Sequence, residues 1–300
     1  MRNRSEFKSL VMRCRARSTL SGVVCLLLVT SMASGQEAKS DAASSASSSA
    51  AASSEAAEKS GGVSAADAQN PIANLVSLPL QNNTYFDVGP NKSTVNALLI
   101  QPVVPFKFGA NWEIVTRTIV PLIYEPRTSQ TNGATFGLGN VQPQFYLTPT
   151  HPGSVIWGIG PQLWLPTASD PTLGNNHLGG GAAAVVLTVK GHWLYGFLAN
   201  QVWAAGNSKE RTNQFTFEPF VFYNLPRGWY LTSTPVATAQ WEEHGHNVWT
   251  VPVGGGVGRL FTVGRQPINI RLEAFDNVHR PDGAPSWQTQ LQVQFLFPQH

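Results

Sequence analysis

The sequence predicts an all-β fold, an antiparallel transmembrane β-barrel of about twelve strands with short periplasmic turns and longer extracellular loops. Three observations predict it. Only 12% of the 300 residues are charged, about half the usual share, which suits a surface that faces lipid. Segments of alternating polar and apolar residues recur along most of the chain. The connections between these segments alternate between short and long.

Residues 1–35 are typical of a cleaved export signal. A basic start precedes the apolar core Gly22–Val29 and the small residues Ala33-Ser34-Gly35. An uncleaved anchor is the alternative. Both cysteines, Cys14 and Cys25, lie before this cleavage site, so the mature chain would contain no disulfide and no cysteine-based zinc site. The signal holds six of the 20 basic and one of the 17 acidic residues, which leaves 14 against 16. Without a basic patch, nucleic-acid binding has no support.

Residues 36–70 are rich in alanine and serine and are expected to form a disordered tether, because such a composition cannot bury a core. The barrel is then expected to occupy residues 71–300. The apolar segment Asn74–Leu80 precedes the first strand. It is interpreted either as a plug in the periplasmic mouth or as the lead-in to that strand.

Strands are expected wherever an alternating segment reaches the roughly 9–11 residues that cross a bilayer at a tilt. Their cores begin at Pro79, Val95, Trp112, Gly139, Val155, Gly181, Trp193, Gln214, Trp229, Val248, Ile268 and Trp287. Connections such as 190–192 are short, whereas 168–178 and 279–285 are long and polar. With both termini in the periplasm, every short connection becomes a periplasmic turn, as in bacterial outer-membrane barrels.

The last strand shows the two faces most clearly. From Trp287 to Phe297, one face is mostly apolar and includes Leu291, while the other carries four glutamines and Leu296. Alternate residues of a strand point to opposite sides. The apolar face is therefore expected on lipid and the glutamines in the lumen. Aromatic residues at the ends of several strands predict girdles at the two membrane interfaces.

Prolines conflict with a simple barrel, because a proline cannot donate a ladder hydrogen bond. Seven fall inside expected strands and are expected at bulges or kinks: Pro102, Pro121, Pro143, Pro161, Pro219, Pro235 and Pro252.

Several stretches carry a family likeness: Asn70–Leu75, Gln81–Thr84, Ile100–Phe106, Thr116–Pro121, Thr135–Asn140, Gly228–Ser233 and Trp249–Gly258. Together they resemble the bacterial outer-membrane barrels known as meta-pathway phenol-degradation proteins, which also carry the names neuromedin U and transporter. The likeness covers roughly residues 70–298. It implies a location in the outer membrane and a role in passing small, often aromatic, compounds. It supplies no catalytic motif.

Charged and amide residues on the polar faces are the candidates for the lumen lining. A charge on the lipid face near mid-membrane costs about 2–4 kcal/mol, which favours inward placement. The candidates are Glu113, Arg117, Gln142, Gln144, Gln162, Glu218, Arg259, Arg271, Glu273, Gln288, Gln290, Gln292 and Gln294. Arg117, Glu218, Arg271 and Glu273 are expected to form a polar cluster across the lumen.

The function expected from these features is passive passage of small, aromatic or hydrophobic, molecules through an outer membrane. The alternative is a structural or surface-exposed barrel without an open pore, in which the inward charges only stabilise the wall. A barrel enzyme is less favoured, because no histidine has a strand serine beside it in sequence. No cofactor and no metal are expected, since the pair His244 and His246 lacks a fixed third ligand. The expected partners are membrane lipid and an unidentified solute, and the sequence leaves the oligomeric state open.

Overall fold

The computed structural model describes residues 59–60, 62–126, 133–204 and 211–298. The expected signal and most of the expected tether lie outside these residues. The barrel strands are β3 (Val76–Val88), β4 (Ser93–Ile100), β5 (Val103–Phe108), β6 (Trp112–Glu125), β7 (Thr135–Leu138), β8 (Gln142–Pro149), β9 (Val155–Trp164), β10 (Gly179–Lys190), β11 (Trp193–Ala204), β12 (Thr212–Asn224), β13 (Trp229–Ser233), β14 (Ala237–Gln240), β15 (Trp249–Val263), β16 (Gln266–His279) and β17 (Trp287–Phe297). Two short 3₁₀ turns, η1 (Pro226–Gly228) and η2 (Gly245–Asn247), lie in connections. Among the described residues, no helix is long and apolar enough to span a membrane.

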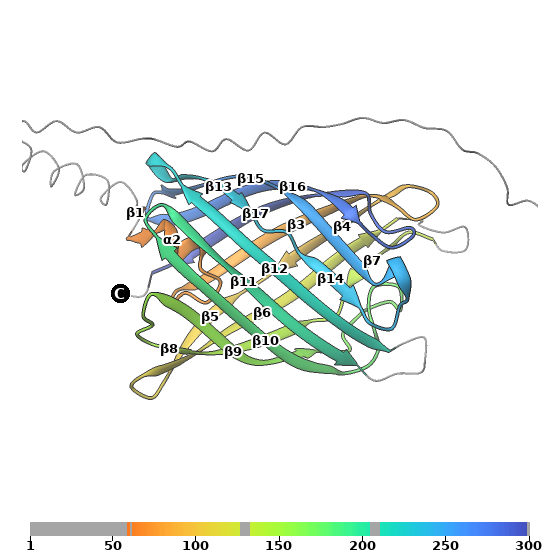
Figure 1. The fold of residues 1–300 in the computed structure, drawn as a ribbon, viewed down its shortest axis with the longest axis horizontal. Helices are drawn as coiled ribbons and strands as arrows, with labels where there is room; N and C mark the ends of the chain where they lie inside the picture. Colours follow the sequence, from red (N-terminus) through yellow and green to blue (C-terminus); the bar gives the residue numbers. More distant parts are fainter. Residues whose placement is uncertain (1–58, 61, 127–132, 205–210, 299–300) are drawn as a thin grey trace, which may run out of the picture. The chain divides into compact units, whose positions relative to one another are not determined.

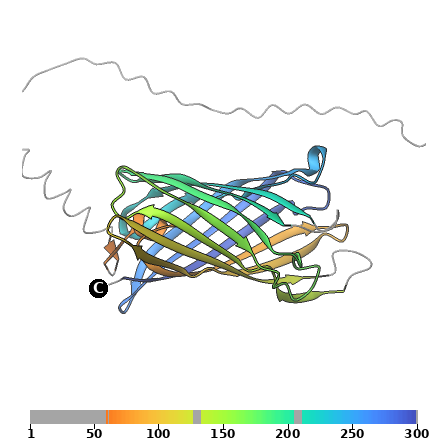
Figure 2. The ribbon, with the colours of Figure 1, turned by 90° about the horizontal axis from the view of Figure 1, so that it is seen from below.

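These fifteen strands form one antiparallel sheet that closes on itself, because β17 pairs with β3 from Trp287↔Phe86 to Phe297↔Val76. In three places, two short strands lie one after the other and share one position in the wall. These are β4 and β5, β7 and β8, and β13 and β14. The described residues therefore form twelve wall strands, which cross the barrel at a tilt (Figures 1 and 2). The expected all-β barrel is confirmed.

The two ends of the barrel differ. We call the end where β3 begins and β17 finishes the turn end, because it carries the short connections, such as 191–192 between β10 and β11. The opposite end, called here the loop end, carries the longer connections, such as 165–178 between β9 and β10 (Figure 1).

Five of the seven prolines lie where the sheet is interrupted, whereas Pro143 and Pro161 lie opposite regular partners, Thr118 and Ala182. Pro102 and Pro235 fall in the breaks between β4 and β5 and between β13 and β14. Pro121 and Pro219 lie opposite such breaks, where the neighbouring strand offers no regular partner. Pro252 lies at a register shift between β15 and β16. A missing N–H costs least at positions where the ladder is already broken.

Inward and outward residues alternate along each strand. In β17, Leu291 is 44% exposed on the outer face, whereas its neighbour Gln290 is 5% exposed and faces inward. Large aromatic side chains are exposed on the outer face near both ends, with Trp112, Trp157, Trp193 and Trp229 at the turn end and Tyr124, Trp203, Trp241 and Trp287 at the loop end. This pattern is that of a barrel wall in lipid with an aromatic girdle at each interface.

A short segment before β3 enters the turn end. It contains β2 (Val63–Ser64), which pairs with β1 (Lys59–Ser60), and the helix α2 (Ala65–Gln69). Ser64 caps α2 through a capping box with Asp67. We call residues 63–75 the N-terminal plug. The expected boundary between tether and barrel at residue 70 is therefore wrong, because residues 63–70 are folded. Of the segment Asn74–Leu80, the residues from Val76 onward belong to β3.

Candidate functional site

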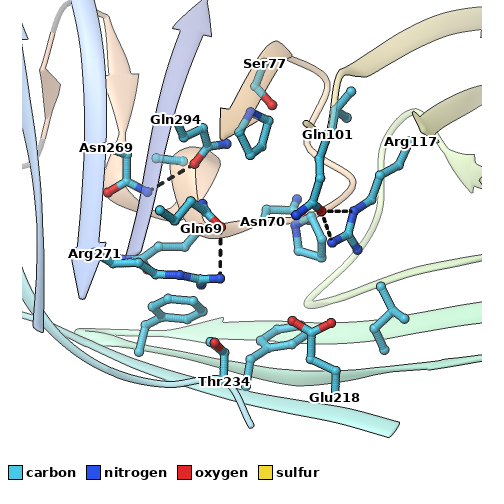
Figure 3. Close-up of a pocket in the computed structure, with 18 residues that line it drawn as sticks. Gln69, Asn70, Ser77, Gln101, Arg117, Glu218, Thr234, Asn269, Arg271 and Gln294 are labelled. Carbon is cyan, nitrogen blue, oxygen red and sulfur yellow. Dashed lines mark hydrogen bonds between the residues drawn. The ribbon is translucent and has the colours of Figure 1, made fainter. Parts of the chain in front are cut away.

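Two cavities lie inside the barrel. The inner cavity, of about 80 Å³, lies beside the N-terminal plug and is lined by Gln69, Asn70 and residues of the wall (Figure 3). The second, of about 400 Å³, extends toward the loop end, and we call it the outer chamber. Four residues line both cavities: Gln101, Arg117, Leu198 and Glu218. They mark the layer where the two cavities meet.

Arg117 is held by a chain of amides. Its Nε and Nη2 atoms donate to Oε1 of Gln101 at 3.1 and 2.5 Å. The amide nitrogen of Gln101 then donates to Gln81, and that of Gln81 donates to Asn83. These inward side chains of β3, β6 and the break after β4 fix the guanidinium in the lumen.

Arg271 and Glu273 form an ion pair on β16, with Nε and Oε2 3.3 Å apart. Nη2 of Arg271 also donates to Gln292 at 3.0 Å. The Glu273 carboxylate accepts the hydroxyl of Thr232 and both the backbone N–H and the hydroxyl of Thr234, at 2.7–3.1 Å. These bonds fall at the break between β13 and β14, so Glu273 replaces ladder bonds that the interrupted strand lacks.

Glu218 differs from Glu273 because no hydrogen bond or ion pair joins its carboxylate to another described residue. It reaches into the lumen from β12, between Arg117 on one wall and Arg271 on the other (Figure 3). The positive charges of both guanidiniums attract this carboxylate without touching it. Of the expected cluster, Arg117, Glu218 and Arg271 line the inner cavity, and Glu273 is joined to it through its ion pair with Arg271.

The turn-end half of the lumen is filled by apolar side chains. Ile72 of the N-terminal plug is 2% exposed and packs in a cluster with inward residues of the wall, among them Val115, Tyr146, Leu187, Leu194, Phe220, Phe222 and Tyr230. Gly158 lies directly beneath Ile72, since a Cβ there would lie 3.2 Å from the Ile72 side chain. The opposite side of the plug packs Ala65, Ala68 and Leu75 against Leu260 and Leu296.

One polar contact also holds the plug. Gln69 Nε2 donates to Asn224 Oδ1 at 2.7 Å, and Asn224 Nδ2 donates back to Gln69 Oε1 at 3.2 Å. Asn224 is the last residue of β12. The plug and the apolar cluster together fill the lumen at the turn end.

The connection 165–178 is fixed to the wall at the loop end. Asn140, in the break between β7 and β8, donates to the carbonyls of Leu165 and Asn175 and accepts the backbone N–H of Asn175, each at 2.7 Å. Leu173 is 6% exposed. Within this loop, the backbone N–H and hydroxyl of Thr172 donate to Asp170 and hold the pKa of that carboxyl below its usual range. The loop therefore has a defined conformation.

The structure places most of the predicted lumen residues on inward faces. Gln142, Gln144, Gln288 and Gln290 line the outer chamber, and Gln292, Gln294 and Arg271 line the inner cavity. Gln162 is buried and accepts a hydrogen bond from Gln144. Glu113 is 5% exposed near the turn end, with one carboxylate oxygen lacking a partner among the described residues.

Arg259 is the exception. Its guanidinium lies 5.1 Å from the ring centroid of Trp229, which is exposed on the outer face. Val253 and Val257, which share the strand face of Arg259, are 57% and 47% exposed on the outer face. The inward residues are Gly254, Gly256 and Gly258, and a Cβ at Gly258 would collide with Tyr230. Arg259 therefore belongs to the outer aromatic girdle, where it interacts with the face of an indole.

Sequence reasoning missed the contacts of residues 63–73 with the wall and the two buried tyrosines. Tyr146 donates to Gln144 at 3.0 Å and Tyr230 donates to Asn269 at 2.7 Å. The pair Ser64 and Asp67 is the signal that could have revealed α2, because this spacing is that of a capping box. Nothing in the sequence alone shows that Ile72 enters the barrel.

His246 and His279 lie at the loop end. His246 Nε2 is 3.2 Å from Asp282, and a ring nitrogen of His279 is 3.1 Å from the His246 carbonyl oxygen. In the part of the chain that the structure describes, no three His, Cys, Asp or Glu side chains gather as a metal site. These contacts join the two loops to each other.

No model of a protein family matches the sequence, and no curated protein matches it. Among solved structures, the chain is similar to the COG4313 outer membrane channel from Pseudomonas putida F1, with a TM-score of 0.57 and 14% identity over 76% of this chain and 97% of that one. Outer membrane phospholipase A from Escherichia coli matches at a TM-score of 0.43, with 12% identity over 77% of this chain and 93% of that one. The CymD monoaromatic hydrocarbon channel matches at 0.42, with 7% identity over 75% and 88%. At these identities the first match shows the fold of an outer-membrane barrel. The other two, with TM-scores of 0.43 and 0.42, add nothing to it.

Proposed function

We propose that this protein is an outer-membrane channel that passes small molecules passively and that the N-terminal plug closes it on the periplasmic side. The observation that carries the proposal is a polar chamber of about 400 Å³ inside the barrel. Toward the turn end this chamber gives way to an apolar cluster that includes a residue from outside the wall, Ile72. Such a residue can leave without breaking any wall strand.

The outer surface supports the membrane location. Apolar side chains such as Leu272 and Leu291 are 54% and 44% exposed there, between two girdles of aromatic residues. This much exposed apolar surface is unfavourable in water and favourable in lipid. The turn end then faces the periplasm, which places the N-terminal plug on that side, and membrane lipid is the partner of the outer face.

The plug is held weakly enough to move. Its helix has only five residues, too short to be stable without packing. Apart from the Gln69–Asn224 pair, its described contacts with the wall are mainly between apolar side chains. We propose that release of Ile72 from its seat above Gly158 opens a path from the outer chamber to the periplasm.

The finer assignments follow from the resemblance. We propose that this chain belongs with the meta-pathway phenol-degradation barrels, whose motifs it resembles, and the similarity to the COG4313 channel supports a barrel of that general kind. Removal of residues 1–35 would leave a chain that begins near Gln36, which N-terminal sequencing of protein from outer membranes would show. The protein is proposed to be a channel and not an enzyme, because the described histidines lie in connections or at the end of β16, and none has a strand serine beside it in sequence.

Conductance in planar bilayers tests the channel. Ile72→Asp would place a carboxylate in an apolar cluster, and an unpaired buried charge is strongly unfavourable, so the plug should leave and conductance should rise well above wild type. Asn74→Asp is the matched control, since Asn74 is exposed on the same plug and its conductance should remain that of wild type.

A second candidate, a structural barrel without an open pore, is favoured by the tightly filled turn-end half of the lumen. If Ile72→Asp inserts as a folded barrel and conducts no more than wild type, this second candidate holds and the channel fails.

A further inference from the structure

The wall of the outer chamber is unusual in its chemistry. Of its twenty-one lining residues, nine are asparagine or glutamine and three are threonine. Only four, Leu99, Ile119, Leu198 and Val236, are branched aliphatic residues. Most small-molecule sites have mainly apolar walls with a few polar groups. This chamber shows the reverse proportion.

Several of these amides retain hydrogen-bonding capacity. For Gln142, Asn200, Gln288 and Gln290, no hydrogen bond joins the side chain to another described residue. Each primary amide offers two donors and an acceptor with two lone pairs. Trp164 also lines the chamber, and its indole N–H is buried without a partner among the described residues. Buried polar groups are normally hydrogen-bonded, so these groups are suited to bonding with the chamber's contents.

The wall is also nearly neutral. Its charged members are one guanidinium, Arg117, and one carboxylate, Glu218, which cancel. Arg117 is already engaged by Gln101. An ionic solute would therefore lose its hydration in the chamber without gaining a net opposite charge.

We infer that the outer chamber binds an uncharged small molecule with several hydroxyl groups, such as a monosaccharide or cyclic polyol, in preference to a hydrocarbon. The inference rests on the proposed channel function and names its solute class, which departs from the aromatic or hydrophobic solute that the sequence resemblance implies. Hydroxyl groups both donate and accept hydrogen bonds, so they can satisfy amide N–H and C=O groups together. The rings of Tyr85 and Trp164 supply an apolar surface for the C–H face of a ring. The volume of about 400 Å³ lies in the range of small-molecule sites.

An apolar solute fits this wall poorly. To enter, it would displace water from the amides and leave their donors and acceptors unpaired, which is the main reason that polar sites reject analogues lacking the matching group. Four branched aliphatic side chains spread among the polar ones do not offset that loss. The same reasoning applies whatever the route by which a solute leaves the chamber.

Calorimetric titration of the purified full-length barrel in detergent micelles tests the inference without requiring an open pore. The probes are D-glucose, myo-inositol, the anion gluconate and the hydrocarbon toluene. Glucose or myo-inositol should bind measurably, and gluconate and toluene should bind at least about tenfold more weakly, the equivalent of one hydrogen bond.

Two variants of β17 make the test specific. Gln290→Leu removes an amide from the chamber and should weaken binding of the hydroxylated probe by about tenfold. Thr289→Leu changes the next residue, which faces outward, and should leave the affinity unchanged. Tighter binding of toluene than of the hydroxylated probes, or no binding of glucose and myo-inositol by wild type, would overturn the inference.

The two proposals fail separately. Loss of sugar binding alongside a conducting Ile72→Asp variant would overturn only the solute class. Sugar binding alongside an Ile72→Asp variant that does not conduct would overturn only the channel.

Discussion

The side-chain amides of Gln69 and Asn224 exchange two hydrogen bonds although 155 positions separate them in the chain. Gln69 ends the short helix of the N-terminal plug, and Asn224 ends a wall strand at the turn end. Both residues are buried. The pair therefore joins the N-terminal plug to the wall through hydrogen bonds.

Asn224→Ala should loosen the plug. The change leaves the amide of Gln69 buried without its partner, which costs about 1–3 kcal/mol in the closed state. The open fraction in single-channel recordings should rise accordingly, by roughly 5- to 150-fold. Asn213→Ala is the control, because Asn213 lies on the same strand at the loop end and bonds to Gln201, away from the plug. Equal recordings from the two variants would show that the pair does not hold the plug.

Arg259→Ala should leave ion selectivity unchanged, because Arg259 lies on the outer face against Trp229. The expected loss of stability is about 0.5–1 kcal/mol, the strength of an exposed cation–π contact. Arg117→Ala should instead shift the reversal potential in a salt gradient, since Arg117 lines both cavities. Both measurements are made in the Ile72→Asp background, where the channel is expected to be open. A shifted reversal potential for Arg259→Ala would show that Arg259 faces the lumen.

Leu291→Arg should lower the free energy of unfolding by about 2–4 kcal/mol if Leu291 lies near the bilayer midplane, because it would place a guanidinium in lipid. Gln290→Arg should be milder, because residue 290 faces the chamber and lies opposite Glu273 in the register. Guanidinium-induced unfolding in lipid vesicles compares the two. Equal losses would mean that the faces of β17 are assigned wrongly.

Glu273→Ala should destabilise the barrel by about 3–5 kcal/mol, because it breaks a buried ion pair and leaves Arg271 without its carboxylate. It also removes the acceptor that holds Thr234 at the strand break. Glu113→Gln removes a charge from a buried carboxylate that has an unpartnered oxygen, so the free energy of unfolding should stay near the wild-type value. A loss for Glu113→Gln as large as that for Glu273→Ala would indicate that Glu113 has a partner of its own.

The strands could be predicted from the sequence because lipid and lumen impose opposite chemistry on alternate residues. The glutamines of β17 face the lumen, and the aromatic residues at strand ends lie on the outer face, so both follow this rule directly. The same rule failed in β15, where the inward residues are glycines and carry no side-chain chemistry. There, Arg259 lies an even number of residues after Trp249 and therefore on the same face of the strand. That spacing would have placed Arg259 on the outer, aromatic face.

The N-terminal plug could not be predicted for a different reason. Its contacts join Ile72 to wall residues far away in the sequence, such as Tyr146, Leu194 and Phe222. Short-range patterns show α2 through its cap but not where the helix lies. The breaks at Pro102 and Pro235 were likewise visible only as a conflict with regular strands, because the compensating bonds come from distant side chains such as Glu273.

The closure of the barrel has a consequence for its assembly. The pairing of β17 with β3 joins the last strand to the first, and the plug packs against Leu296 on that last strand. Contacts so distant in sequence form late, because a long chain segment must be ordered before they are made. The site that receives the plug is therefore complete only when the wall is closed. A newly inserted barrel then closes its wall and fills the turn end of its lumen in the same step.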